Sequence, residues 1–200
     1  MGFVLLGMMT LSQIGLSGAV LQMFSHGIIA SLLFAVVGRM VYERTHTREL
    51  SVLEGMNLSK AMPFTAVTFV IASVASMGLP GFSGFIAELQ VLIGAWKTFP
   101  ALAVVAGIGI IIGVAYTLRV LIKSFFADTV GTSSTSSHFK NKNNKDAVGR
   151  VPTTIPEKLG ASILIVTTFV IGIYPQLLLD LIMPSLNSPL MQPLWKGGQP

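Results

Sequence analysis

Hydrophobic residues form long, nearly uninterrupted stretches along most of the chain. Four stretches are long enough to cross a bilayer, which needs roughly 20 apolar residues, and they cover about 16–41, 61–96, 101–126 and 159–182. Residues 1–11 form a shorter apolar segment that cannot span alone, and we interpret it as the end of a truncated helix. The pattern therefore predicts an all-α, polytopic membrane protein with about four full transmembrane helices.

The second stretch is too long for one straight crossing. Its roughly 36 residues would make a helix about 54 Å long, whereas the hydrocarbon core is roughly 30 Å thick. Pro80 cannot continue a helix, and Gly78 and Gly81 are conformationally free, so we predict a hinge between two half-helices, about 61–77 and 83–96. Unwound backbone at membrane depth must be buried in protein or line a watery cavity, and broken helices are common in transporters.

The segment 128–150 differs in composition from the rest of the chain. It is rich in Ser, Thr, Asn and Lys and cannot bury a core, so we predict that it belongs to a flexible loop. It divides the chain into a transmembrane part over 1–126, the loop over 127–158, a C-terminal transmembrane helix over 159–182 and a tail over 183–200.

The charges are few and unevenly placed. Only 10% of the residues are charged, against roughly 25% in soluble domains. Every Lys and Arg except Lys97 and Lys196 lies in or beside the loops 42–60 and 127–158 or at the end of the third stretch. Two crossings separate these loops, so they share one side, which the positive-inside rule makes cytoplasmic. The net charge of +5 therefore reflects orientation in a membrane, and we expect no nucleic-acid partner.

Glu88 is a lone carboxylate in an apolar setting just beyond the predicted hinge. Burying an unpaired charge costs several kcal/mol, and ionisable residues inside membranes tend to mark ion or proton pathways. A structural alternative is a Glu that only hydrogen-bonds neighbouring helices. We favour a proton-loading site because the depth of the residue and the adjacent hinge coincide.

His26 lies near the middle of the first full stretch. An imidazole there can exchange protons near neutral pH, although a core His bonded to a backbone carbonyl would fit equally well. Further polar residues in these stretches are Ser25, Gln22, Ser73, Ser76, Ser83, Gln90 and Tyr116. We take Ser25, Ser76, Ser83 and Tyr116 as candidates for lining water, against the simpler interpretation of helix–helix hydrogen bonding.

Several kinds of site are missing from the sequence. The chain has no Cys, which excludes thiolate metal sites, iron–sulfur ligation and disulfides. No nucleophile–base pair, metal motif or dinucleotide motif is visible. We therefore expect no catalytic residue, no metal and no cofactor in this chain.

Four segments together resemble a known family. Residues 1–7, 18–27, 42–48 and 77–82 are similar to the antiporter-like membrane subunits of NADH:quinone oxidoreductase (respiratory complex I), and most closely to subunit M, or chain 4. The same fold occurs in Mrp-type cation/proton antiporters and in two sister subunits, which mostly carry Lys where this chain has Glu88. The resemblance implies the C-terminal part of a fourteen-helix fold, so that 1–126 belongs to its second repeat.

The resemblance also implies a function and an assembly. His26 matches the family's membrane-centre His, and Glu88 matches its broken-helix Glu. They imply a proton pathway in a non-redox subunit that couples electron transfer from NADH to quinone to proton pumping. NADH, FMN, iron–sulfur clusters and quinone would be bound by other subunits. The implied partners are the antiporter-like chains 2 (N) and 5 (L) in a bacterial cytoplasmic membrane.

Two alternative functions remain open. One is a subunit of an Mrp-type antiporter that exchanges sodium or potassium for protons, although Glu88 in place of Lys speaks against it. The other is a structural membrane piece that pumps nothing.

Overall fold

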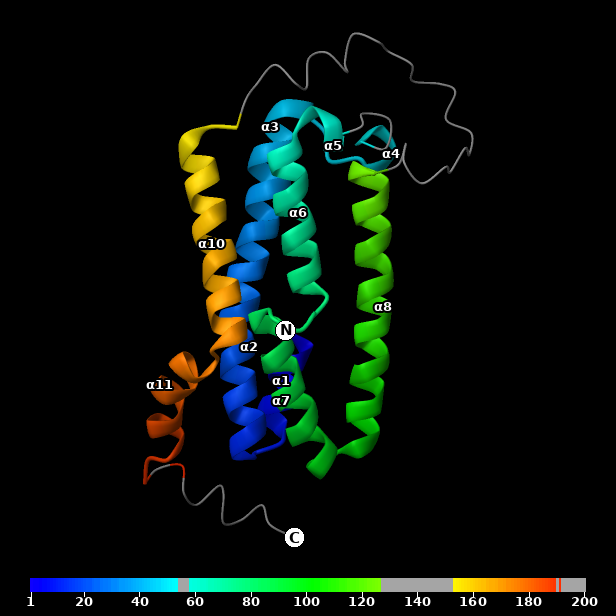
Figure 1. The fold of residues 1–200 in the computed structure, drawn as a ribbon. Coiled ribbons are helices and arrows are strands. Elements are labelled where there is room, and N and C mark those ends of the chain that lie inside the picture. The colour runs from blue at the N-terminus through cyan, green and yellow to red at the C-terminus, as the bar shows by residue number, and fades with distance from the viewer. Residues whose placement is uncertain (54–57, 127–152, 190, 192–200) are drawn as a thin grey trace. The chain divides into compact units, whose positions relative to one another are not determined.

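The computed structural model describes residues 1–53, 58–126, 153–189 and 191. These residues form helices and turns without any strand, which confirms the all-α prediction. Figure 1 labels the helices. They are α1 (Gly2–Met9), α2 (Gln13–Phe34), the π-helix Ala35–Val41, α3 (Tyr42–Thr45), α4 (Leu50–Leu53), α5 (Leu58–Ala61), α6 (Pro63–Ser76), α7 (Ser83–Thr98), α8 (Pro100–Phe125), α10 (Ile155–Ile173) and α11 (Gln176–Leu186).

Within the described residues, three helices are long and apolar enough to cross a membrane. They are Gln13–Thr45, which joins α2, the π-helix and α3, then Pro100–Phe125 and Ile155–Ile173. Helices α6 and α7 are shorter, and they are the two half-helices that the sequence predicts on either side of the hinge. The broken helix and the three long helices agree with the predicted membrane architecture.

The prediction of a single helix over 159–182 is wrong. Helix α10 begins earlier and ends at Ile173, and α11 starts at Gln176. Pro175 lies between them, and its ring blocks the hydrogen-bond ladder of a helix that arrives from its N-terminal side. The tail boundary at 182 falls inside α11. The end of α11 is tied to the start of α2, because Gln13 Nε2 donates a hydrogen bond to Asn187 Oδ1 at 2.6 Å.

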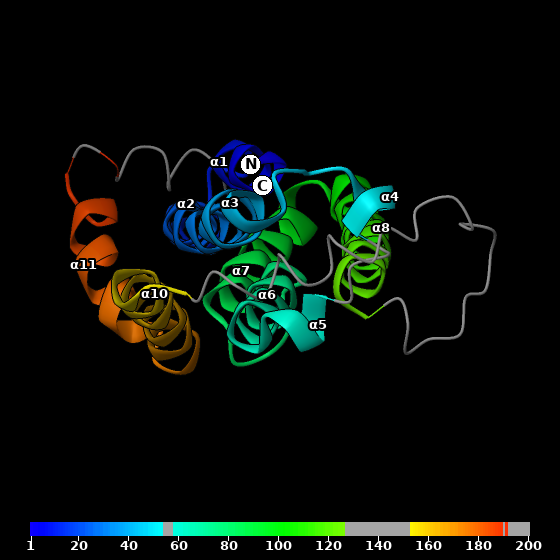
Figure 2. The same cartoon turned by 90° about the horizontal axis from the view of Figure 1, so that it is seen from above.

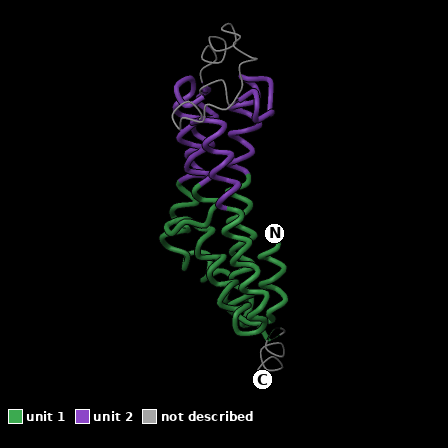
Figure 3. The backbone as a smooth tube through the Cα atoms, turned by 90° about the vertical axis from the view of Figure 1, so that its right-hand side faces the viewer, with its two compact units in different colours: residues 1–30, 74–113, 166–200 green, residues 31–73, 114–165 purple. Residues whose placement is uncertain are grey.

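The chain divides into two compact units, which Figure 3 distinguishes by colour. Unit 1 comprises 1–30, 74–113 and 166–200, and unit 2 comprises 31–73 and 114–165. Each long helix contributes one part to each unit, and the units are described separately below.

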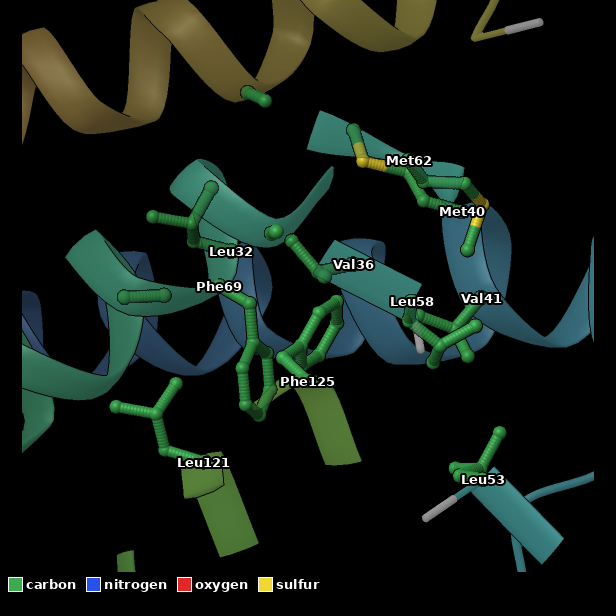
Figure 4. Close-up of a cluster of buried hydrophobic side chains, with 13 residues drawn as sticks. Leu32, Val36, Met40, Val41, Leu53, Leu58, Met62, Phe69, Leu121 and Phe125 are labelled. Carbon is green, nitrogen blue, oxygen red and sulfur yellow. The ribbon is translucent and has the colours of Figure 1, made fainter. Parts of the chain in front are cut away.

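Unit 2 has its own apolar core, shown in Figure 4. Leu32, Val36 and Met40 recur at four-residue spacing, which places them on one face of a helix, and all three are fully buried or nearly so. The rings of Phe69 and Phe125 stack with centroids 4.8 Å apart. This core packs the first span, α6 and the end of α8 against one another.

A buried ion pair joins two helices of unit 2. Arg44 Nη2 donates to Glu157 Oε2 at 2.9 Å, and the side chains are only 2% and 7% exposed. Arg44 also donates to the Met40 carbonyl at 2.8 Å, while the backbone N–H of Thr154 donates to the Glu157 carboxylate at 2.8 Å. The pair therefore connects the end of the first long span to the N-terminus of α10.

The packing of unit 1 depends on glycines where α1, α2 and α7 lie side by side (Figures 1 and 2). A Cβ at Gly7 would lie 2.7 Å from the Gly15 carbonyl oxygen, and one at Gly94 would lie 2.7 Å from the Gly15 Cα. A Cβ at Gly18 would lie 2.8 Å from the Gln90 Cβ. Small residues at such contacts let helix backbones approach closely in membranes.

The unwound segment before α7 is covered by α10. A Cβ at Gly172 has no room against the Gly81 carbonyl oxygen and the Phe82 backbone. The rings of Phe82 and Phe169 lie 4.5 Å apart between centroids. Helix α10 thus covers the end of the hinge at Gly81 and Phe82, whereas Leu79 and Pro80 are exposed.

Gly172→Ala tests this cover. We expect the variant to lose about 1–3 kcal/mol of stability, because the added methyl group overpacks the contact. Gly160→Ala is the matched control on the same helix, since nothing lies within 4 Å of a Cβ there. Thermal unfolding of the purified protein in detergent measures both, and equal midpoints for the two variants would contradict the close packing of α10 on the hinge.

Glu157→Gln tests the buried ion pair. Removing the charge leaves the Arg44 guanidinium buried without its counter-charge, which costs about 3 kcal/mol or more. Glu43→Gln is the control, because its pair with Arg39 at 3.1 Å is 48% and 63% exposed and such pairs contribute about 1 kcal/mol or less. The same unfolding measurement should show a large loss for Glu157→Gln and almost none for Glu43→Gln; the reverse order would rule out the structural role of the pair.

Candidate functional site

The hinge lies where the sequence predicts it. Gly78 and Gly81 have φ angles of +70° and +99°, which L side chains rarely adopt, and Pro80 stands between them. The backbone N–H of Gly78 donates to the Ala75 carbonyl at 3.2 Å. Phe82 is extended, with φ −106° and ψ 153°, so the chain leaves one helix in a turn and enters α7 from an extended residue.

Glu88 lies in the second turn of α7 and is half-buried. Its carboxylate packs against the hinge itself, because a Cβ at Gly78 would lie only 2.6 Å from Glu88 Oε2. Glycine at 78 therefore suits the positive φ and also leaves room for the carboxylate where it lies. The predicted hinge and the predicted proton site thus form one site.

Gln22 of α2 is the side chain that hydrogen-bonds the Glu88 carboxylate. It is 7% exposed, and its Oε1 atom has no hydrogen-bond partner among the described residues. Leu21 and Ala87, which adjoin the two residues in sequence, are fully buried in one apolar cluster with Ile171. The carboxylate–amide contact therefore has a dry apolar cluster beside it.

Helices α2 and α7 are antiparallel where they meet. Gly18 faces Gln90, Gln22 bonds Glu88, and Ile29 lies 3.5 Å from a Cβ position on Gly84. This register places Ser25 between the Gln22 and Ile29 contacts. Ser25 is fully buried and so is Ser83 at the start of α7.

Buried oxygens gather on this helix pair. The oxygen atoms Gln22 Oε1, Ser25 Oγ, Ser83 Oγ and Gln90 Oε1 have no partner among the described residues. Buried polar groups in proteins are nearly always hydrogen-bonded to protein or to ordered water. These oxygens therefore retain hydrogen-bonding capacity on the helix pair that includes Glu88.

The remaining predicted residues lie elsewhere. His26 is on the exposed side of α2, next to the buried Ser25. Ser76 is exposed at the end of α6. Tyr116 is 63% exposed and belongs to unit 2, whereas Glu88 belongs to unit 1. The structure thus places Ser25 and Ser83 on the helices that hold Glu88 and does not bury His26.

The direct partner of Glu88 was not identified from the sequence. Gln22 stood among several polar residues, and nothing in its own stretch assigned it to a residue far along the chain. The one available signal was its spacing, since Gln22 and Ser25 lie three residues apart and therefore on one face of a helix.

No group of three or more His, Cys, Asp or Glu side chains in the described part of the chain is arranged to hold a metal ion. The expectation that this chain holds no cofactor stays a prediction.

Comparison with known proteins identifies the family of this chain. The sequence model of the family described as "NADH:quinone oxidoreductase/Mrp antiporter, TM" matches residues 1–113, which is more than half of the chain. The chain belongs to this family. Membership and the long apolar helices make it a multi-pass membrane protein.

Individual curated relatives agree with this family membership. The chain is 34% identical over 192 residues to NADH-quinone oxidoreductase subunit M of Rickettsia felis, covering 96% of this chain and 36% of the relative. It is 40% identical over 192 residues to NAD(P)H-quinone oxidoreductase chain 4 of Gloeobacter violaceus, covering 92% and 34%. The chain spans about a third of the length of these curated relatives.

A solved structure has the same fold. The chain superposes on a chain of respiratory complex I from Thermus thermophilus, solved with bound NADH, with a TM-score of 0.69 and 26% identity. The match covers 98% of this chain and 36% of that one. The antiporter-like fold that the sequence motifs imply is therefore confirmed.

The contact between Gly78 and Glu88 can be tested by a double-mutant cycle. Gly78→Ala should cost about 1–2 kcal/mol for its positive φ in any background, and more in the wild type because the methyl group meets the carboxylate. In a Glu88→Ala background that second contribution should vanish, which gives a coupling of about 0.5–3 kcal/mol in thermal or denaturant unfolding.

Gly81→Ala is the control for this cycle, because nothing lies within 4 Å of a Cβ there. Its effect should add to that of Glu88→Ala within about 0.5 kcal/mol. If Gly78→Ala is equally additive, the carboxylate does not pack against the hinge.

Proposed function

We propose that this chain is part of a proton-translocating membrane subunit of NADH:quinone oxidoreductase, in which Glu88 takes up and releases a proton. The observation that carries the proposal is the position of the carboxylate: half-buried, on a broken helix, and packed against the Gly78 that breaks it. Ionisable groups in such places inside membranes serve ion and proton pathways.

The surroundings of Glu88 support a change of charge. A carboxylate that switches between charged and neutral forms needs polar partners in both states, because an unpaired buried charge is costly. The Gln22 amide and the buried hydroxyls of Ser25 and Ser83 supply such partners, directly or through water. His26, one residue beyond Ser25, is the second proton-exchanging group of the pathway, and its exposed ring is accessible to other parts of the protein.

The proposal assigns this chain no redox chemistry. NADH, FMN, iron–sulfur clusters and quinone are bound by other subunits of the complex, and electron transfer there changes the electrostatic field at the proton pathway. The relatives named as subunit M and chain 4 support this assignment. The antiporter-like chains 2 (N) and 5 (L) are the proposed neighbours in the membrane.

The placement of cations supports the orientation. Among the described residues, every Lys and Arg except Lys97 lies in unit 2, with the loop 42–60 and the ends of α8 and α10. By the positive-inside rule this supports a cytoplasmic position for the loops 42–60 and 127–158. Bacterial relatives support a bacterial cytoplasmic membrane. Residues 127–152 lie outside the described part of the chain.

An antiporter function is the second candidate, because the matching family description includes Mrp antiporters. It would have the chain exchange sodium or potassium for protons without redox input. The Glu at position 88 favours the oxidoreductase, since the resemblance gives the antiporters mostly Lys there.

Glu88→Gln in the full-length subunit tests the proposal. We expect NADH-driven proton pumping by membrane vesicles to be largely lost, because an amide cannot take up the proton. Glu88→Asp should retain part of the activity, because the carboxylate is kept at a shorter reach. Asp180→Asn is the control, since Asp180 is exposed on α11 and its loss should leave pumping unchanged.

Unchanged pumping in Glu88→Gln would disprove the role of Glu88. Sodium-dependent proton transport in vesicles that receive no redox donor would instead favour the antiporter function. Loss of pumping in Asp180→Asn to the same degree would indicate a general loss of assembly.

A further inference from the structure

Gln22 is the one side chain recorded as a hydrogen-bonding partner of Glu88 among the described residues. It comes from a different helix, is 7% exposed, and is held at its place by the close approach of α2 to α7 at Gly18. Its amide nitrogen faces the carboxylate, and its Oε1 is buried without a partner among the described residues. The amide nitrogen of Gln22 is thus hydrogen-bonded to Glu88, and its Oε1 atom can still accept a hydrogen bond.

A primary amide suits a group that gains and loses a proton. It carries two N–H donors and one carbonyl acceptor, and a protonated carboxyl group carries an O–H donor that an ionised one lacks. With Glu88 ionised, Gln22 Nε2 donates to the carboxylate. With Glu88 protonated, a half-turn of the amide lets Gln22 Oε1 accept a hydrogen bond from the carboxyl O–H. The pair stays bonded in both states.

We propose that Gln22 is the positioning residue of the proton site: it holds the Glu88 carboxyl group against Gly78 in both protonation states by reversing its amide. This rests on the proposed function of Glu88 as a proton site. Gly78 also contacts the carboxylate, because a Cβ there would lie 2.6 Å from Glu88 Oε2. The Glu88 carboxyl group can then change charge and keep a hydrogen bond to Gln22, whose loss would cost stability in either state.

The other titratable groups on the elements around α7 do not replace Gln22. His26 is exposed on α2, and Lys97 is exposed at the far end of α7. Asp180 is exposed on α11. Within the described residues, the Gln22 amide is therefore the group placed to hydrogen-bond Glu88 in both protonation states.

Infrared difference spectroscopy of the assembled complex, carrying the full-length subunit, tests the proposal. Acidic-minus-alkaline spectra of wild type and Glu88→Gln identify the Glu88 carboxyl C=O band by its loss. Gln22→Met keeps the length of the side chain and removes donor and acceptor. We expect the band to move to higher wavenumber, because the protonated carboxyl group loses the hydrogen bond from its O–H to Gln22 Oε1. NADH-driven pumping should fall about fivefold, the factor of one net hydrogen bond.

Gln90→Met is the matched control. Gln90 is the other amide on this helix pair with a buried, unpartnered Oε1, and it contacts Gly18 and not Glu88. Its removal should leave the band in place. An unmoved band in Gln22→Met, an equal movement in Gln90→Met, or the absence of any band that depends on Glu88 would each overturn the proposal.

The Glu88 infrared band and the NADH-driven pumping together distinguish the proton role of Glu88 from the positioning role of Gln22. If Glu88→Gln pumps normally while Gln22→Met moves the Glu88 band, the positioning by Gln22 stands and the pumping role of Glu88 fails. If Glu88→Gln abolishes pumping while Gln22→Met leaves band and pumping unchanged, the proton site stands and the role of Gln22 fails.

Discussion

Backbone hydrogen bonding in a hydrocarbon environment is the constraint on which unit 1 depends. Each unsatisfied backbone group costs several kcal/mol there, so a helix can be interrupted only where protein or water takes over its bonds. The turn bond from the Gly78 N–H to the Ala75 carbonyl satisfies part of the hinge. Gly172 and Phe169 pack against the Gly81 and Phe82 end of the hinge. Positive φ angles at Gly78 and Gly81 make this compact path sterically allowed.

The same interruption creates the place where a carboxylate can be held. A continuous helix would keep the neighbours of Glu88 apolar and its backbone groups bonded. Here the missing Cβ of Gly78 provides space, and the glycine contact between α2 and α7 brings the Gln22 amide within bonding distance. A hydrogen bond to a charged group contributes about 1.5–3 kcal/mol, which offsets much of the cost of keeping Glu88 half-buried.

The sequence predicts features that depend on local chemistry and misses those that depend on register. Length together with Pro80 and two glycines was enough to place the hinge and both half-helices. The same reasoning applied to Pro175 would have ended α10 in the right place, but apolar residues on both sides hid the turn. The π-helix at Ala35–Val41 has no periodicity that an apolar run could reveal. The bond between Gln22 and Glu88 depends on the antiparallel register of two helices that are far apart in the chain. The exposure of His26 could not be predicted, because its stretch is apolar on every side.

Apart from Lys97, the described Lys and Arg residues and the proposed proton site at Glu88 belong to different units. Unit 2 contains the described Arg residues and the buried pair of Arg44 with Glu157. In the described part of unit 1 the only Lys or Arg is Lys97, exposed near the end of α7. A permanent cation beside Glu88 would hold the carboxylate ionised. A site that must alternate between two charge states is better served by a neutral amide, which can bond either form.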